Sequence, residues 1–361
     1  MEKELKLMKG NEAIAEAAIR SGADGYFGYP ITPQSEVIEY LMAEKPHERT
    51  GMVVLQAESE VAAINMLYGG AGAGMKVMTS SSSPGISLKQ EGISYIAGAE
   101  LPCLILNVVR GGPGLGTIQP GQSDYFQSVK GGGHGDYRLI VLAPASVQEM
   151  YDFVELGFEL AWKYRNPAMI LSDGVIGQMM EKVELGPEKQ RRTREQVVKD
   201  APWATTGKTP ERRGNIITSL DLIAANQEEF NIKLQAKYKE IEANEVRFEE
   251  IDTEDADYIM IAYGSSARIC QKAMQIARKK GIKVGLLRLI TLFPFPTKQI
   301  AKMAENVKGF LAVEMSAGQM VEDVRLAVNG KKPVEHYGRM GGMIPTAEEI
   351  IEALEQKIIG G

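Results

Sequence analysis

One acidic residue, Glu58, is the side chain in this sequence whose position most clearly suggests chemistry. It follows the apolar stretch 52–56, a predicted strand, and precedes a small-residue run that is predicted to be a helix. Pro84 and Gly85 come after a second predicted strand. A buried carboxylate at a strand end can hold a strong, charge-assisted hydrogen bond. The simpler alternative is an acid stabilised by a helix N-terminus, and Glu60 would serve equally well for that purpose.

The arrangement around Glu58 resembles the half-site that holds the aminopyrimidine ring of thiamine diphosphate. In that half-site, a glutamate beside the N1′ nitrogen favours the tautomer that removes the C2 proton. The interval from Glu58 to Pro84-Gly85 matches thiamine enzymes as different as acetolactate synthase. The resemblance assigns cofactor activation to Glu58 and places the turn Ser82-Ser83-Pro84-Gly85 along the pyrimidine pocket.

A second motif, Tyr29-Pro30-Ile31-Thr32-Pro33, follows another predicted strand. Its two prolines fix the backbone at a strand C-terminus, where open α/β sheets bind ligands. We therefore expect the Thr32 hydroxyl at the cleft. The alternative is a rigid turn in which Thr32 or Ser35 caps the next helix.

Arg110 ends the apolar strand predicted at 103–109 and precedes a glycine-rich loop at 111–117. An arginine fork in this position can bind a carboxylate, such as that of a 2-oxo acid. The alternative is a surface salt bridge. The loop lacks the Gly-Lys-Ser/Thr of a phosphate loop, and the run 69–74 ends a helix rather than opening one, which argues against a dinucleotide site.

The metal-binding and redox residues are sparse. The two cysteines, Cys103 and Cys270, are predicted to be buried apolar residues, and they are too few for an iron–sulfur cluster. The three histidines are scattered without metal-ligand spacing. A thiamine enzyme also needs a Gly-Asp-Gly followed at a set interval by asparagine, to hold magnesium and the diphosphate. Ser172-Asp173-Gly174 is a near match without that asparagine. The diphosphate half is therefore expected on another chain.

Composition and pattern predict two α/β domains. The chain has 361 residues, 44% of them hydrophobic, and a formal net charge of −6, which argues against non-specific nucleic-acid binding. No apolar window is long enough for a membrane span. The charged start at 1–6 has no signal-peptide core, so we expect a cytoplasmic protein.

Strands alternate with helices over residues 1–186 and again over 253–361, a pattern that is typical of parallel sheets with right-handed crossovers. Between them, residues 187–252 are predicted to form a linker that contains one long, charged, amphipathic helix at 217–246.

Taken together, these motifs resemble the alpha subunit of the 2-oxoacid:ferredoxin oxidoreductases over nearly the whole chain. The run from Tyr29 to Pro33 resembles that family's signature, and 264–265, 294–296 and 313–319 resemble its transketolase C-terminal-like domain. The implied fold is a pyrimidine-type thiamine diphosphate domain of parallel strands plus this second α/β domain.

Within the family, segments 56–65 and 110–116 look most like the branched-chain type, which uses 3-methyl-2-oxobutanoate. The 2-oxoglutarate type tends to have Ser-Thr-Gly where this chain has Gly114-Leu115-Gly116. That type stays open as an alternative. So do a split thiamine enzyme without electron transfer and a non-catalytic scaffold in which Glu58 is only a cap.

The resemblance implies CoA-dependent oxidative decarboxylation of a 2-oxo acid to acyl-CoA and CO2, with electrons passing to ferredoxin. Thr32 would contact the oxo or carboxylate group, Arg110 would bind the carboxylate, and Pro30 and Ile31 would line the cofactor pocket. The residues that could face the substrate side chain are Thr117, Gln119 and Gln122. A beta subunit would hold the diphosphate, Mg2+ and a [4Fe-4S] cluster, and gamma and ferredoxin-like delta subunits would accompany it.

Overall fold

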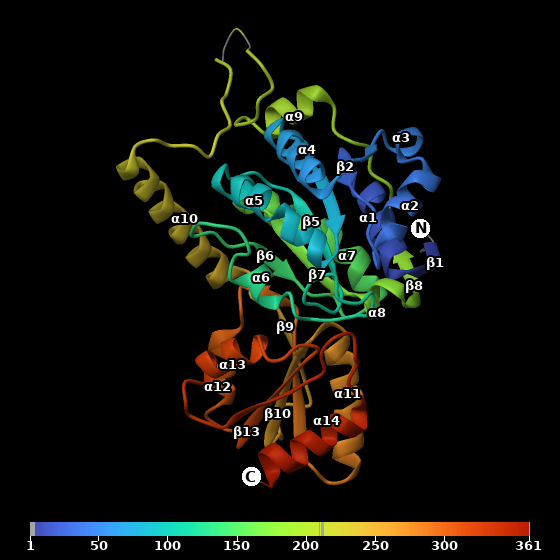
Figure 1. Cartoon of the computed structure of the whole chain (residues 1–361), viewed down its shortest axis with the longest axis vertical. Helices are drawn as coiled ribbons and strands as arrows, with labels where there is room; N and C mark the ends of the chain where they lie inside the picture. The colour runs from blue at the N-terminus through green and yellow to red at the C-terminus, as the bar shows by residue number, and fades with distance from the viewer. Residues whose placement is uncertain (1–3, 209, 211–212, 361) are drawn as a thin grey trace.

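A computed structural model describes residues 4–208, 210 and 213–360, arranged as two α/β domains along the long axis (Figure 1). Residues 1–3, on which the expectation of no signal peptide partly rests, lie outside this part. Among the described residues, no helix is both long and apolar enough to cross a membrane. Cys103 and Cys270 are free and fully buried, as predicted.

The first domain is built on a seven-stranded sheet with the order β12-β6-β7-β5-β4-β2-β3. Its strands are β2 (Gly25–Gly28), β3 (Val53–Gln56), β4 (Val77–Ser81), β5 (Leu104–Val109), β6 (Ile140–Leu142), β7 (Ala168–Asp173) and β12 (Thr291–Phe293). Six strands are parallel, and β4, β5 and β7 are buried throughout, which explains why β5 and the first four residues of β7 are almost entirely apolar. The seventh strand, β12, pairs antiparallel with β6 and comes from the second half of the sequence.

Two groups of helices cover this sheet. In one, α4 packs against α5; in the other, α1 packs against α2 and α7. Right-handed crossovers place the two groups on opposite faces, because the chain moves along the sheet in opposite directions through them. The helices are α1 (Gly10–Arg20), α2 (Ser35–Glu44), α3 (Pro46–Arg49), α4 (Glu60–Gly72), α5 (Ser83–Gly98), α6 (Tyr125–Val129), α7 (Val147–Tyr164), α8 (Gly174–Gln178) and α9 (Arg194–Asp200).

A short antiparallel ribbon closes this domain. It joins β1 (Glu4–Lys9) to β8 (Met180–Leu185), so the described N-terminal strand is tied to the end of the first domain. The side chains of Leu5 and Leu7 on β1 are more than half exposed. Such a short ribbon with an exposed face carries little sequence signal, and we did not predict it.

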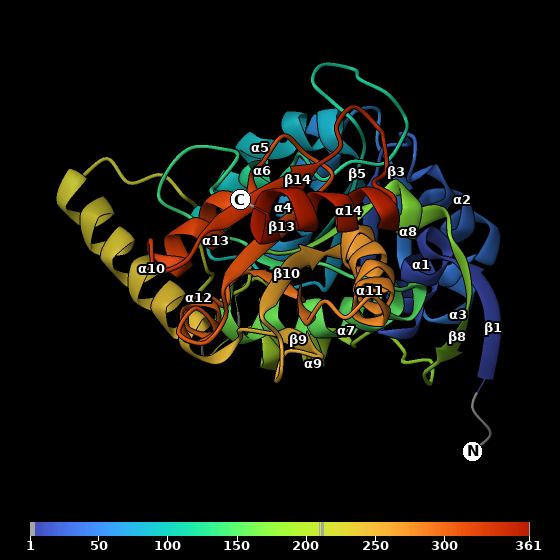
Figure 2. The same ribbon diagram turned by 90° about the horizontal axis from the view of Figure 1, so that it is seen from below.

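The connecting segment differs from its prediction. The long helix, α10 (Ala224–Asn244), starts seven residues after the predicted start at 217. Before it, Thr218 Oγ1 accepts a hydrogen bond from the Leu220 N–H, and Asp221 Oδ1 accepts one from the Ile223 N–H. These local side-chain bonds compete with helical bonds and delay the helix. The helix protrudes from one side of the molecule in both views (Figures 1 and 2).

The second domain contains a five-stranded sheet with the order β14-β13-β10-β11-β9, in which only the edge strand β9 is antiparallel. Its strands are β9 (Phe248–Ile251), β10 (Tyr258–Tyr263), β11 (Val284–Leu289), β13 (Gly309–Glu314) and β14 (Val334–Gly338). Its helices are α11 (Gly264–Lys279), α12 (Thr297–Met303), α13 (Met320–Val328) and α14 (Ala347–Leu354), followed by the π-helical turn η1 (Glu355–Ile359). In this domain α11 packs on α14, and α12 packs on α13.

The amide of Gln122 joins the two domains. Its Nε2 donates to the Tyr263 carbonyl at 3.0 Å, and its Oε1 accepts from Ser266 Oγ at 2.6 Å and from the Met315 N–H at 2.9 Å. Nearby, Ser265 Oγ donates to the buried carboxylate of Asp173. The interface is therefore a satisfied polar network rather than a loose hinge.

Replacing Gln122 by alanine should destabilise the protein by about 3 kcal/mol, because three buried polar groups would each lose a partner. Thermal unfolding of the purified protein measures this change. The control is Gln119→Ala at an exposed position, which we expect to change stability by less than ~0.5 kcal/mol. Equal effects of the two substitutions would contradict the assignment of Gln122 as the joint.

Candidate active site

The predicted site residues gather at one edge of the seven-stranded sheet. The loops after β2, β3, β4 and β5 all leave the carboxyl ends of parallel strands. From β2 the chain moves to one side of the sheet, and from β4 it moves to the other, so the switch point lies between these two neighbours. Open α/β sheets bind ligands at such a point.

The two acids after β3 differ sharply in environment. Glu58 is exposed in the loop, so the prediction that it is buried is wrong for this chain. Glu60 is the first residue of α4 and only 7% exposed. Ser59 is the helix cap, its Oγ accepting a hydrogen bond from the Ala62 N–H at 3.1 Å. The cap places Glu60 at the helix N-terminus, where the macrodipole stabilises a negative charge.

Glu60 packs directly against the predicted Ser-Pro-Gly turn. A Cβ added to Gly85 would lie 2.9 Å from Glu60 Oε1 and 2.1 Å from Ser81 Oγ. Only glycine therefore permits this approach. Pro84 is in the first turn of α5, so the N-termini of α4 and α5 both lie beside the Glu60 carboxylate.

Buried polar atoms between the end of β4 and the start of α5 lack partners. Within the described part of the chain, no donor is hydrogen-bonded to the Glu60 carboxylate, and Ser81 Oγ and Ser82 Oγ are buried without a partner. Buried polar groups are normally paired, so these free atoms are what an external polar ligand would satisfy. A carboxylate and two hydroxyls fit the ring nitrogens and amino group of an aminopyrimidine.

The loop with Pro30, Ile31 and Thr32 is anchored to the same place. Gln34 is fully buried; its Nε2 donates to the Tyr29 carbonyl, and its Oε1 accepts from Ser80 Oγ on β4. The Tyr26 hydroxyl extends this hydrogen-bond network with a 2.6 Å contact to Ser80 Oγ. Pro30 and Ile31 are half-buried, and Thr32 is exposed at the edge of the site.

Arg110 is brought next to Thr32. Its Nη1 donates to the Thr32 carbonyl at 2.9 Å, and its Nη2 donates to the Leu115 carbonyl at 3.0 Å. The residue is 7% exposed, its Nε is buried without a partner, and no described carboxylate forms an ion pair with it. The surface salt bridge considered above is therefore not seen among the described residues. Ser83 Oγ accepts a hydrogen bond from the Arg110 N–H.

A second, partly buried acid, Asp124, lies behind this part of the site. Ser83 N–H donates to Asn107 Oδ1, and Asn107 Nδ2 donates to Asp124 Oδ2 at 2.9 Å. Burial raises the pKa of Asp124, and the hydrogen bonds from Asn107 and Ser83 partly oppose this. Neither Asn107 nor Asp124 was predicted from the sequence, because each stands alone without a motif.

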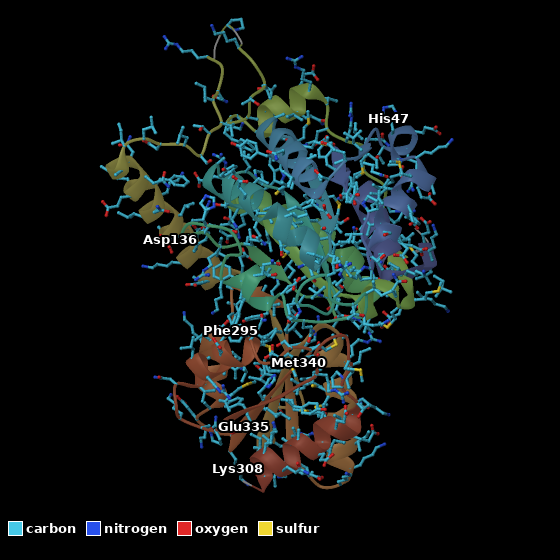
Figure 3. The ribbon with its side chains drawn as sticks, viewed as in Figure 1. His47, Asp136, Phe295, Lys308, Glu335 and Met340 are labelled. Atoms are coloured by element: carbon cyan, nitrogen blue, oxygen red, sulfur yellow. The ribbon has the colours of Figure 1, made fainter. Side chains whose placement is uncertain are left out.

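The three residues expected near the substrate side chain divide into two groups. Thr117 is half-buried and Gln119 is exposed, both in a loop that packs on the second domain; a Cβ on Gly342 would lie 2.5 Å from the Gln119 Cβ. Met340, just before this contact, lies on the side of the second domain that faces the first (Figure 3). The expectation for Gln122 is wrong. This residue is 2% exposed, and its amide forms the hydrogen bonds that join the two domains, so it is not free to contact substrate.

Comparison with known proteins identifies the family. Residues 16–252 match the family model described as "Pyruvate flavodoxin/ferredoxin oxidoreductase, thiamine diP-bdg". The chain belongs to this family. Residues 256–350 match the pyruvate:ferredoxin oxidoreductase core domain II. The chain is thus a 2-oxoacid:ferredoxin oxidoreductase subunit with a thiamine diphosphate-binding domain, as the sequence motifs predicted.

Relatives of known type support the assignment as a subunit of such an oxidoreductase. The chain is 51% identical to ketoisovalerate oxidoreductase subunit VorB of Methanothermobacter thermautotrophicus, over 97% of both chains. It is 35% identical to 2-oxoglutarate synthase subunit KorA of Archaeoglobus fulgidus, over 98% of this chain and 100% of the relative.

Solved structures agree on the fold. A 2-oxoglutarate:ferredoxin oxidoreductase from Magnetococcus marinus superposes with a TM-score of 0.86 at 28% identity, covering 99% of this chain and 66% of that one. A split-gene transketolase superposes with a TM-score of 0.60 at 13% identity, which bears on the fold alone. The predicted transketolase-like architecture is confirmed.

Gly85→Ala should abolish the close approach of Glu60 to α5, because a methyl group would overlap Ser81 Oγ. We expect purified enzyme complex to lose bound thiamine diphosphate and at least about tenfold in activity, the scale of a misplaced charge-stabilising group. The control is Gly69→Ala on α4, where an added Cβ meets nothing within 4 Å. Normal cofactor content in the Gly85 variant would contradict the packing argument.

Proposed function

We propose that this chain is the alpha subunit of an oxidoreductase that converts 3-methyl-2-oxobutanoate (ketoisovalerate) and coenzyme A to acyl-CoA and CO2, with electrons passing to ferredoxin. The observation that carries the substrate assignment is the 51% identity, along the whole chain, to a ketoisovalerate oxidoreductase subunit. The structure adds a matching feature. The loop at 111–119 that follows Arg110 carries no charged side chain, and its Leu115 and Ile118 are exposed. A branched aliphatic substrate needs apolar contacts there, whereas 2-oxoglutarate needs a second cation.

The second candidate is 2-oxoglutarate. It is favoured by the 35% identity to a 2-oxoglutarate synthase subunit and by the likeness to a 2-oxoglutarate:ferredoxin oxidoreductase. Aliphatic pockets discriminate weakly between neighbouring chain lengths, but a buried carboxylate without a cation is strongly disfavoured. The uncharged loop therefore places this candidate second.

Thiamine diphosphate, when bound, supplies the nucleophilic carbon that attacks the 2-oxo group. For its pyrimidine ring, the geometry supports Glu60 over Glu58 as the activating carboxylate. Glu60 is buried beside Gly85 and close to the unpartnered hydroxyl of Ser81, whereas Glu58 is exposed. Ser81 and Ser82 would add hydrogen bonds to the ring's polar edge, and Pro30, Ile31, Ser83 and Pro84 would line the pocket.

Substrate binding is assigned to Arg110 and Thr32. The guanidinium is buried, positively charged and without a carboxylate partner among the described residues, and its Nε is free. It is held in place by two backbone carbonyls, so binding a substrate carboxylate would need little reordering. Thr32 lies at the mouth of the site, where its hydroxyl can reach the oxo or carboxylate group. Thr117 and Gln119 remain candidates for the side-chain end.

The rest of the reaction requires partner subunits. Apolar side chains beside the site are exposed, with Val61 at 47% and Leu88 at 55%, and a beta subunit that covers them would exclude water. We propose that this partner holds the diphosphate, Mg2+ and a [4Fe-4S] cluster, and that gamma and ferredoxin-like delta subunits complete a cytoplasmic assembly.

The two glutamates provide a matched pair of variants. Glu60→Gln should lower turnover at least about a hundredfold, because it removes a preorganised charge from a dry site. Glu58→Gln should change turnover less than about threefold, since an exposed side chain contributes little. Turnover of the complex with its beta subunit, together with circular dichroism to check folding, measures both. The reverse pattern would restore the sequence-based assignment of Glu58.

The substrate is tested by dye reduction with coenzyme A and three 2-oxo acids: 3-methyl-2-oxobutanoate, 2-oxoglutarate and pyruvate. We expect the highest kcat/KM with the branched-chain acid, because the loop after Arg110 is apolar and uncharged. If kcat/KM is highest with 2-oxoglutarate, the proposed reaction stands but the proposed substrate is wrong. No reduction by a complex that contains cofactor and clusters would overturn both.

A further inference from the structure

Lys89 on α5 is a lysine that is fully buried, and nothing in the proposed chemistry uses it so far. Its Nζ donates to Thr79 Oγ1 at 2.6 Å and to the Ser80 carbonyl at 3.0 Å, both on β4. No described carboxylate lies within ion-pairing distance. Lysines are almost never fully buried without a paired acid. A methionine would fill the same space without the desolvation penalty of a charge.

The helix register places Lys89 beside the pyrimidine site. Gly85 and Lys89 are one turn apart on α5 and therefore share a face. Gly85 abuts Glu60, and one further turn along, Gly92 abuts Ile64 of α4, where an added Cβ would lie 2.6 Å from the Ile64 side chain. Lys89 thus lies between two close contacts with α4, on the α5 face that meets Glu60.

Glu60 is the acid whose negative charge affects the pKa of Lys89. Burial lowers the pKa of Lys89 to about 7, and the charge of Glu60 opposes this shift. The neighbouring strands β4 and β5 carry no ionisable side chain, and α4 carries only Glu60 and Tyr68. On β2, Tyr26 reaches Ser80, but burial raises its pKa, so it stays neutral.

We propose that Lys89 is a positioning residue whose ammonium group holds Glu60 in its ionised form, ready for the pyrimidine ring. This inference rests on the proposed role of Glu60. The lysine reaches no solvent, so it acts through the field of its charge and not through contact with substrate. That explains why a charge is kept where an apolar side chain would pack as well.

The first test is the pH profile of kcat/KM in the intact complex. Without the ammonium group, protonation of Glu60 becomes easier. The acidic limb should therefore move up by about one pH unit, as loss of a nearby charge in a partly shielded site predicts. Lys89→Met and Lys89→Gln should show the same shift, although glutamine can still donate a hydrogen bond to Thr79. The control, Lys45→Met at an exposed lysine, should keep the wild-type profile.

A wild-type profile in Lys89→Gln would overturn the proposal, since the role would then be hydrogen bonding alone. A second readout does not depend on activity. It compares the thermal unfolding midpoints of the wild-type complex and of complexes that carry Lys89→Met, Glu60→Gln or both substitutions. Without Glu60 the buried ammonium loses the one acid that faces it from the described elements packed around it, so Lys89→Met should raise the midpoint more in the Glu60→Gln background than in wild type. Equal shifts in the two backgrounds would contradict charge coupling. High activity of Glu60→Gln alone would instead remove the proposed role of Glu60, and the thermal cycle would still report the coupling.

Discussion

The close packing of the Glu60 carboxylate against Gly85 is the contact on which the site depends. A carboxylate that is 7% exposed, without a donor among the described residues, is unfavourable unless its surroundings stabilise charge. The N-termini of α4 and α5 provide that stabilisation, and glycine provides the space. The same packing leaves the hydroxyls of Ser81 and Ser82 free. An incoming ring would therefore meet a preorganised charge and two hydrogen-bonding groups.

The larger architecture keeps this contact aligned with the substrate-binding residues. The switch point between β2 and β4 sets the Thr32 loop beside the start of α5, and β5 delivers Arg110 to the same edge. Gln122 then fixes the second domain to the first, and the loop after Arg110 rests on that domain. The apolar side chains left exposed around the site mark where a partner subunit is needed to exclude water.

The sequence predicted most of this arrangement, because buried parallel strands appear as continuous apolar runs and the site motifs follow them directly. It assigned cofactor activation to Glu58, whereas the geometry supports Glu60. Both acids follow the same strand, and the cap made by Ser59 decides which one enters the helix. Gln122 looked like a loop residue because its partners come from distant segments. The strand β12 depends on pairing with a strand far away in the sequence, which the local pattern does not report. The delayed start of α10 depends on local side-chain hydrogen bonds, which hydrophobic periodicity does not report either.

The most direct test of the central claim is a cryo-electron microscopy structure of the enzyme complex with thiamine diphosphate bound. The quantity to measure is the distance from the N1′ nitrogen to each candidate carboxylate. We expect an oxygen of Glu60 at a charge-assisted hydrogen-bond distance of about 2.8 Å from N1′, with Glu58 outside the pocket. A structure in which Glu58, or an acid of the partner subunit, contacts N1′ instead would contradict it.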